Sequence, residues 1–136
     1  MRTEQKHKLA RLRHWRVRRK IRGTKERPRM SVRFTNENIY VQFIDDNAGT
    51  TLAAASTTSK TAPGRDKLAA NVASAKVIGK LAAEAALAKG IKIVVFDRGG
   101  ARYHWSRNKG KDGKPVTVLG KLAALAEAAR AAGLKF

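Results

Sequence analysis

Polar and apolar residues alternate in the first half of the chain, which is the pattern of strands with one buried face. Two alternating runs cover residues 30–34 and 39–44, and each is followed by residues typical of turns, Thr35–Asn38 and Asp45–Gly49. A further run over Thr50–Thr58 predicts a third strand. This part of the chain should therefore form a three-stranded antiparallel meander.

The spacing changes to that of a helix after the next loop. Apolar residues recur at steps of three and four between Leu68 and Ala85, and Lys89-Gly90 is a C-terminal helix signal. Gly79, inside this helix, should let the helix approach a sheet closely. The β-branched run Ile91–Phe96 predicts a buried strand that completes a βαβ unit.

A last helix is predicted near the end of the chain, and it should close on Gly133-Leu134 in a Schellman-type ending. Its apolar stripe consists of Leu122, Leu125, Ala126 and Ala129. The predicted order is β-β-β-α-β-α, an α/β fold in which helices pack on one mixed sheet.

Charge changes this picture in two segments. The 136 residues contain 30 Lys and Arg against 10 Asp and Glu, a net charge of +20, and most of the excess lies in residues 1–33 (+12) and 98–121 (+6). The start of the chain has only scattered apolar residues and no helical stripe, so it should not fold alone. We therefore expect an extended basic arm over residues 1–29 and an α/β domain over 30–136, with a basic loop inserted at about 105–120.

The same composition limits the class of partner. So large a positive charge favours a polyanion, and the chain has neither a lipidation motif nor a strongly amphipathic helix for an anionic membrane. Charges stand where a signal peptide would be apolar, and cysteine is absent, so we expect a cytoplasmic protein. An organellar transit peptide is the alternative interpretation of the Arg-rich start.

Arginine is the most frequent cation of the arm, with nine Arg against four Lys before Met30. The guanidinium group binds phosphate oxygens in a bidentate manner and stacks on exposed bases, so RNA binding is predicted. A merely solvated charged surface is the alternative, although such a charge density disfavours a compact free state.

Enzymes and chromatin proteins are two other classes to consider. Asp45, Asp46, Glu84 and Asp97 could be imagined as a two-metal nuclease cluster. However, the first two are turn formers, Glu84 can pair with Lys80, and Asp97 beside Arg98 can pair or act as a cap. Because these carboxylates have other roles, we predict no catalytic residue and no cofactor. The three histidines are dispersed, so we predict no metal site. No helix-turn-helix or zinc finger signature is present, and we do not expect sequence-indifferent DNA binding.

Several segments, in order along nearly the whole chain, resemble the bacterial family of large-subunit ribosomal protein eighteen. They are Arg18–Thr24, Arg27–Val32, Asn38–Asp46, Leu52–Thr57, Lys89–Lys92, Phe96–Gly100 with Tyr103-His104, and the tail from Ala124 to Phe136. The resemblance implies a ribosomal protein that binds 5S rRNA, helps attach it to 23S rRNA in the central protuberance, meets neighbouring ribosomal proteins, and places its arm between the two RNAs.

The chain departs from the family pattern in two places. The family usually has an aromatic residue and then an arginine after the first strand's valine, whereas here Arg33 precedes Phe34. The family also passes through a short connection from Tyr-His into the last helix, whereas Trp105–Gly120 intervene here. This insertion is basic and glycine-rich, and Val116–Leu119 could form half of a small hairpin, so we interpret it as an added RNA-facing loop.

Charge, side-chain chemistry and the resemblance together predict the RNA-binding residues. They are Lys8, Arg11, Arg13, Trp15, Arg16, Arg18, Arg19, Lys20, Arg22, Arg27, Arg29, Arg33, Ser56, Thr57, Lys60, Arg98, Arg102, Tyr103, His104, Arg107, Lys109 and Lys111.

Some of these candidates have equally ordinary alternatives. The indole of Trp15, like that of Trp105, either stacks on a base or docks on the domain. Tyr103 and His104 either touch RNA or pack at a strand end. The hydroxyl and ammonium groups near Ser56 either donate to phosphates or form a polar strand end.

Overall fold

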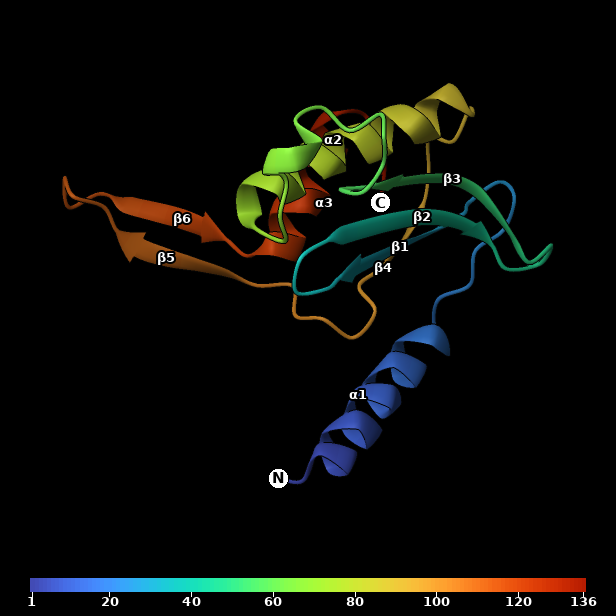
Figure 1. Cartoon of the computed structure of the whole chain (residues 1–136), viewed down its shortest axis with the longest axis horizontal. Coiled ribbons are helices and arrows are strands. Elements are labelled where there is room, and N and C mark those ends of the chain that lie inside the picture. The colour runs from blue at the N-terminus through green and yellow to red at the C-terminus, as the bar shows by residue number, and fades with distance from the viewer.

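The computed structural model describes all 136 residues and contains a four-stranded sheet, a separate hairpin and three α-helices (Figure 1). The elements in order are α1 (Thr3–Arg18), β1 (Arg29–Phe34), β2 (Ile39–Asp45), β3 (Thr50–Ser56), the 3-10 turn η1 (Arg65–Lys67), α2 (Val72–Ala88), β4 (Val95–Asp97), β5 (Trp105–Lys109), β6 (Pro115–Leu119) and α3 (Lys121–Ala131).

The sheet has the strand order β3-β2-β1-β4 and is mixed, as predicted. Strand β2 pairs antiparallel with both β1 and β3, whereas β4 runs parallel to β1. The alternating pattern sets the register: Val32 lies opposite Val41, and Met30 lies opposite Phe43. These apolar side chains therefore share one face of the sheet.

Helices α2 and α3 cover that face and leave the opposite face open (Figure 1). The core consists of the apolar strand side chains packed against alanine-rich helix faces. Its fully buried members include Met30, Ile39, Val41, Phe43, Ala75, Ile78, Ala82, Ala86, Leu125 and Ala129. Because alanine is small, the two helices can lie close to the sheet and to each other.

Gly79 serves the contact between the two helices and not, as predicted, the contact between a helix and the sheet. A methyl group at this position would collide with the backbone carbonyl of Leu125 and lie 3.1 Å from Cβ of Ala128, both in α3. The sequence indicates that a close approach is needed at a helical glycine, but it does not indicate which neighbour approaches.

Both α2 and α3 end in Schellman geometry, which was predicted for α3, and α2 ends at the predicted Lys89-Gly90. After α2, the amide of Ile91 donates to the carbonyl of Ala86 over 3.0 Å, and Gly90 adopts a φ of 76°. After α3, the amide of Leu134 donates to the carbonyl of Ala129 over 3.2 Å, while Gly133 takes a φ of 112°. Glycine is suited to both sites because a side chain strains this left-handed backbone.

The strand predicted over Ile91–Phe96 is only partly correct. Strand β4 covers Val95–Asp97, and the residues before it pair with the end of the chain: the amide of Val94 donates to the carbonyl of Lys135 over 3.0 Å. A short β-branched run predicts extended backbone but not its partner, because periodicity carries no information about pairing.

The extended arm is also wrong for most of its length, because Thr3–Arg18 form the helix α1. No residue of α1 is buried, which agrees with the lack of an apolar stripe. The helix has no internal Gly or Pro, and 11 of its 16 residues are Arg, Lys, Leu, Ala, Glu or Gln, all good helix formers. Local propensity therefore favours this helix, which projects away from the domain (Figure 1).

Deleting residues 1–20 should leave the domain folded, because α1 buries nothing and its side-chain ion pair with the domain is partly exposed. We expect the far-ultraviolet circular dichroism to lose only the contribution of α1. The melting temperature should fall by less than about 5 °C. Loss of cooperative unfolding would show instead that α1 is part of the domain.

Candidate nucleic-acid interface

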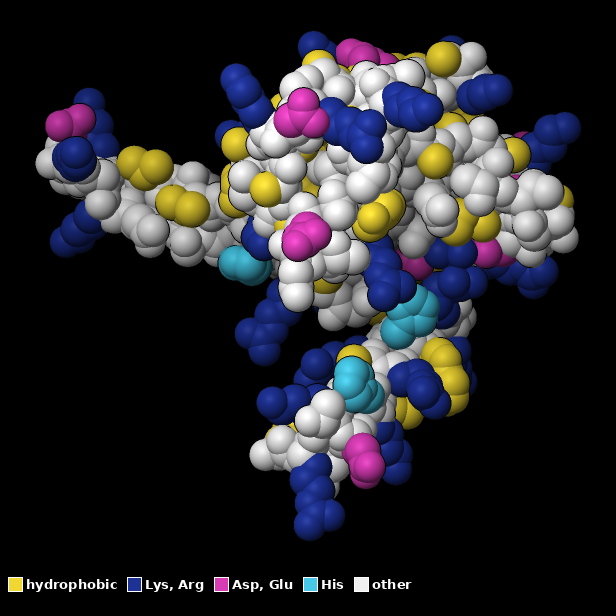
Figure 2. Space-filling view, in the orientation of Figure 1, with side chains coloured by type: hydrophobic (Ala, Val, Ile, Leu, Met, Phe, Trp, Pro, Cys, Tyr) yellow, Lys and Arg dark blue, Asp and Glu magenta, His cyan; other side chains and the backbone are white.

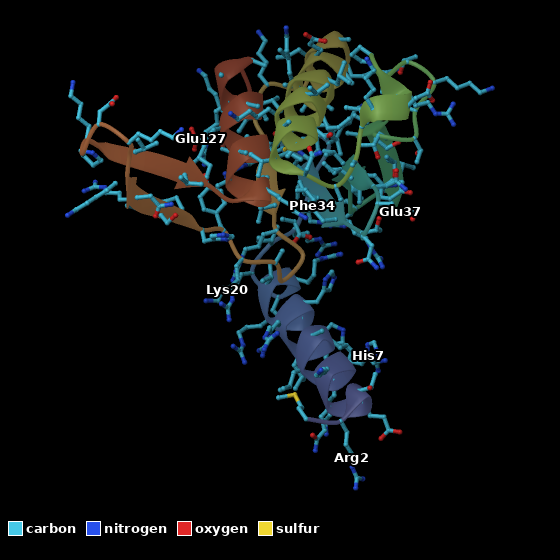
Figure 3. The ribbon with its side chains drawn as sticks, turned by 60° about the vertical axis from the view of Figure 1, so that its left-hand side comes forward. Arg2, His7, Lys20, Phe34, Glu37 and Glu127 are labelled. Atoms are coloured by element: carbon cyan, nitrogen blue, oxygen red, sulfur yellow. The ribbon has the colours of Figure 1, made fainter.

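Nearly all cations of the chain lack a carboxylate partner. Only Arg18, Arg29, Lys80 and Arg130 form ion pairs within 4.0 Å. The side chains of α1 radiate around the helix, with Arg2 and His7 at its far end and Lys20 near the domain (Figure 3). A helix with free cations on every side is arranged for a polyanion and not for packing on this domain.

The predicted cations of the arm, Arg29 excepted, are exposed on α1 or on the segment that follows it. They are Lys8, Arg11, Arg13, Arg16, Arg18, Arg19, Lys20, Arg22 and Arg27. Trp15 is 57% exposed, so its indole does not dock on the domain. Figure 2 shows these cations as the dark blue groups that crowd the projecting helix.

Asp46 connects the domain to the C-terminal end of α1 and the segment up to Gly23, which we call the root of α1. Its carboxylate accepts a 2.8 Å hydrogen bond from the amide of Gly23 and lies 3.4 Å from Nη2 of Arg18. A side chain at Gly23 would collide with the carbonyl of Ile44, so the backbone passes tightly against β2. These contacts at the turn after β2, together with the close approach of Gly100 to Arg13 and His14 in the middle of α1, set the direction in which α1 leaves the domain.

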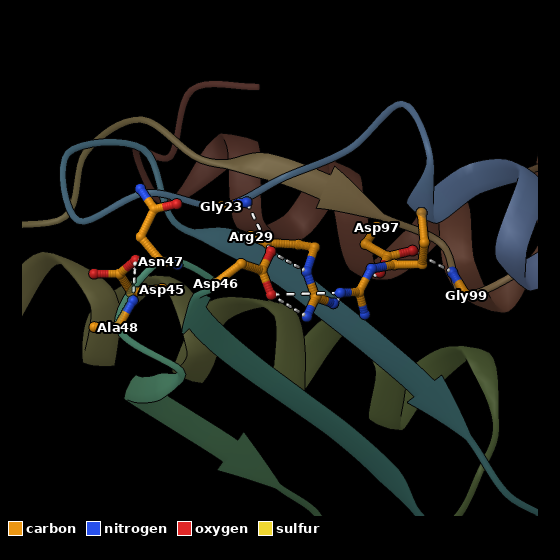
Figure 4. A network of polar contacts seen from close by, with 9 residues as sticks. Gly23, Arg29, Asp45, Asp46, Asn47, Ala48, Asp97 and Gly99 are labelled. Carbon is orange, nitrogen blue, oxygen red and sulfur yellow. Dashed lines mark hydrogen bonds and ion pairs between the residues drawn. The ribbon is translucent and has the colours of Figure 1, made fainter.

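The same carboxylate belongs to a network around Arg29 (Figure 4). Nε and Nη2 of Arg29 donate to the two oxygens of Asp46, each over 2.9 Å, and Nη1 donates to Asp97 over 2.9 Å. The side chain of Arg29 is 5% exposed, and that of Asp97 is fully buried. Two hydrogen bonds from one guanidinium make the Arg29–Asp46 pair bidentate.

This network corrects three interpretations made from the sequence. Arg29 was predicted to contact RNA, but its guanidinium is in the interior and is already neutralised. Asp46 is more than a turn former, and Asp97 pairs with Arg29 and not with Arg98, which instead donates to the carbonyl of Ala101 over 2.9 Å. The capping alternative for Asp97 is confirmed, because its Oδ1 accepts from the amide of Gly99 over 2.9 Å. Sequence patterns could not predict these pairs, which join residues 17 and 68 positions apart.

The hydrogen bonds from Arg29, together with that from Gly23 and the nearby positive charges, lower the pKa of Asp46 from 3.8 to about 2, although partial burial acts against the shift. Hydrogen bonding to Asp46 raises the pKa of Arg29 above its ordinary value. Both groups are therefore charged at neutral pH, as an ion pair requires.

Thr57 is also in the interior. Its hydroxyl accepts from the amide of Ile39 over 3.1 Å and donates to Oδ1 of Asn38 over 2.9 Å, so it stabilises the start of β2 and is not available to RNA. The hydroxyl of the half-buried Ser56 lies 2.9 Å from that of Thr58, and Lys60 is exposed. The polar strand end that we considered as an alternative describes this segment well.

The open face of the sheet carries a groove of about 610 Å³ beneath α1. Its lining brings together the predicted residues Arg33 and Arg98 with His14 and two residues that sequence reasoning missed, Tyr40 and Gln42. The alternation in β2 could have identified them, because they lie on the opposite face from Val41 and Phe43. The groove offers cations, an aromatic ring and an amide on one surface.

The second basic segment begins with residues that pack on α3. The hydroxyl of Tyr103 donates to Glu127 over 3.0 Å and accepts from Arg130 over 3.2 Å, so the packing alternative applies to this residue. The ring of His104 lies against Gly120, where any side chain would collide with it. Arg102, by contrast, is exposed.

The insertion forms a complete hairpin, not a loop with half a hairpin. Strands β5 and β6 pair antiparallel from Trp105 opposite Leu119 to Lys109 opposite Pro115. The hairpin projects from the domain near the start of α3 (Figure 1). Its predicted cations Arg107, Lys109 and Lys111 are exposed.

The family described as ribosomal L18 of archaea, bacteria, mitochondria and chloroplast matches residues 4–109. The chain belongs to this family. Membership confirms the resemblance found in the sequence. The chain is a structural protein of the cytoplasmic ribosome, as predicted, and not an enzyme.

Three relatives of the L18 family are each named large ribosomal subunit protein uL18. The protein of Microcystis aeruginosa is 52% identical over 126 residues, covering 93% of this chain and 92% of the relative. That of Dictyoglomus turgidum is 48% identical over 128 residues, covering 94% and 93%. That of Lactobacillus delbrueckii subsp. bulgaricus is 51% identical over 131 residues, covering 96% and 95%.

The carboxylates considered for a nuclease are accounted for by other contacts. Asp46 and Asp97 are bound by Arg29, Asp45 accepts from the amides of Asn47 and Ala48 in its turn, and Glu84 lies 3.9 Å from Lys80. No group of His, Cys, Asp and Glu side chains is arranged to hold a metal ion.

None of the helices is both long and apolar enough to cross a membrane.

Stability should depend on pH through Asp46. Because folding lowers the pKa of this carboxyl from 3.8 to about 2, the ionised form favours the folded state. This contribution, up to about 2 kcal/mol, is complete above pH ~4 and is lost as the pH falls towards 2.

The isosteric variant Asp46→Asn isolates the effect from that of the other carboxyls. Urea unfolding followed by circular dichroism should show a variant less stable than the natural chain at pH 7, and the difference should shrink to nearly nothing at about pH 2. A difference that stays constant from pH 7 to pH 2 would contradict a role for the Asp46 charge.

Proposed function

We propose that the chain binds 5S rRNA and helps attach it to 23S rRNA in the central protuberance of the large ribosomal subunit. The observation that carries the proposal is the distribution of cations. Two elements project from this L18-family domain, α1 and the β5–β6 hairpin, and their cations have almost no carboxylate partners, whereas the buried Arg29 is paired with acids. Neighbouring ribosomal proteins are the other expected partners.

The geometry of α1 supports a position between two RNA segments. Its cations point around the whole circumference, and none of its residues is buried against the domain (Figure 3). A helix that bound a single RNA surface would need cations on one side only. Phosphates on opposite sides of α1 would use all of them, with arginine preferred for its bidentate geometry.

The open face of the sheet supplies a second set of contacts. Arg33 and Arg98 line the groove beneath α1, and Arg98 is held near Ala101 by its own hydrogen bond. Tyr40 and Gln42 add a ring for stacking and an amide for base edges. We propose that RNA held by α1 also reaches this groove, because His14 of α1 forms part of its wall.

Binding should be specific for 5S rRNA over an unrelated structured RNA of equal length, and it should weaken steeply with salt. If six to ten phosphates are neutralised, the affinity should fall by about 10³- to 10⁵-fold between 50 and 200 mM salt. Filter binding or fluorescence anisotropy over a salt series measures both quantities. Equal affinity for the two RNAs would overturn the 5S proposal.

Matched triple variants test whether α1 carries the contacts. Arg11→Gln/Arg13→Gln/Arg16→Gln should lower the affinity and reduce the salt slope by about 3. Lys76→Gln/Lys89→Gln/Lys92→Gln removes the same charge from exposed positions on and after α2 and should change the slope far less. Equal effects of the two variants would indicate that only net charge matters.

Asp46 should act on RNA binding by positioning α1. In Asp46→Asn the ion pair that Arg18, at the end of α1, forms with residue 46 is lost, so RNA binding must fix the orientation of α1, and the affinity should fall roughly three- to tenfold. The salt slope should stay unchanged because no phosphate contact is lost. Glu37→Gln, which removes one exposed negative charge from the β1–β2 turn, is the control; if both variants bind slightly more tightly, charge and not position is at work.

A further inference from the structure

Packing against the domain does not account for the ordered structure of the β5–β6 hairpin. Every residue from Ala101 to Lys109 is exposed, and so are Lys111–Val118. A two-stranded hairpin alone is at best marginally stable in water. Its projecting position therefore suits an element that becomes buried against a partner.

Local chemistry nevertheless defines the shape of the hairpin. The amide of Gly110 donates to the carbonyl of Lys114 over 2.8 Å, and Gly113 adopts a φ of 72° that glycine accommodates without strain. At the root, the amide of Gly120 donates to the carbonyl of His104 over 3.0 Å. Backbone hydrogen bonds at its turn and at its base therefore preorganise the hairpin before any partner binds.

The register divides the hairpin into two faces. Trp105, Arg107 and Lys109 point to one side, with Leu119, Thr117 and Pro115 opposite them; we call this the cationic face. Ser106 and Asn108 point to the other side with Val118 and Val116; we call this the valine face. The cationic face combines an aromatic ring with two cations at alternate positions of one strand.

Trp105 is placed to receive a planar group. Its side chain is 54% exposed, and the guanidinium carbon of Arg107 lies 5.5 Å from the ring centroid. A tryptophan flanked by a cation is a stacking surface for nucleic-acid bases, every one of which has a π face. The turn beyond it adds Lys111 and Lys114, with Asp112 as the only acid of the hairpin.

We propose that the cationic face and the adjoining turn form a separate RNA-binding site, in which an unpaired base stacks on Trp105 while Lys109 of the face and Lys111 and Lys114 of the turn neutralise the neighbouring phosphates. The site deepens the proposed function and rests on it for the choice of ribosomal RNA. Charge complementarity favours RNA as the occupant: residues 105–119 carry four cations and one acid, and the apolar part of the valine face is limited to two side chains.

Single-tryptophan variants test the stacking directly. In Trp15→Phe the remaining indole is Trp105, and its fluorescence should be quenched when 5S rRNA or 23S rRNA transcribed in vitro is added. In a chain with intact Trp15, Trp105→Ala should weaken binding of the RNA that quenches it by about 5- to 150-fold. Trp105→Phe should recover most of the affinity, because the phenyl ring still stacks.

Val116→Thr/Val118→Thr is the matched control on the valine face. It should leave RNA affinity unchanged, and none of these variants should alter the thermal unfolding of the domain, which the hairpin does not support. Absence of quenching together with unchanged affinity of Trp105→Ala would overturn the site. Loss of RNA binding in the valine variant alone would assign RNA to the other face and overturn it as well.

The measurements also separate this site from the 5S proposal. If 5S rRNA is bound no better than unrelated RNA but Trp105→Ala still weakens binding and quenching persists, the hairpin site stands and the 5S proposal fails. If 5S rRNA is preferred and Trp105→Ala has no effect on either ribosomal RNA, the 5S proposal stands and the hairpin site fails.

Discussion

The buried guanidinium of Arg29 is the interaction on which the rest of the structure depends. It joins β1 to the turn after β2 through Asp46 and to β4 through Asp97, with donor–acceptor distances of 2.9 Å. Removing either carboxylate would leave hydrogen-bond donors of the buried guanidinium without an acceptor, which destabilises the folded chain. The parallel strand and the root of α1 are therefore held by the same charged group.

Charge is handled in opposite ways inside and outside the domain. In the interior, the one buried cation, Arg29, is paired with two acids, and the rest of the core is apolar. On α1 and the hairpin, every cation except Arg18 lacks a carboxylate partner, and the like charges repel one another. Binding to a polyanion would relieve that repulsion, so the two projecting elements and the balanced core together suit a protein of a ribonucleoprotein particle.

The local elements of the fold were accessible from the sequence because their signals are local. Alternation at residues 30–34 and 39–44 identified both strands, and Gly90 and Gly133 marked the ends of α2 and α3. The helix α1 was missed because an apolar stripe was required of it, whereas a helix can form from backbone propensity without burying a face. The RNA-binding candidates remain predictions, apart from Arg29 and Thr57, which the fold uses internally.

The β-β-β-α-β-α order of the four-stranded sheet with its two covering helices, the two basic segments and the membership of a ribosomal family follow from the sequence alone, because periodicity, charge and motif order are properties of neighbouring residues. Three features became visible in the folded chain alone: Arg29 pairs with acids 17 and 68 residues away, Gly79 faces α3, and residues 91–94 pair with the end of the chain. Such contacts depend on where distant segments meet, and the physical reason is that packing the whole core, not any local preference, sets those meetings.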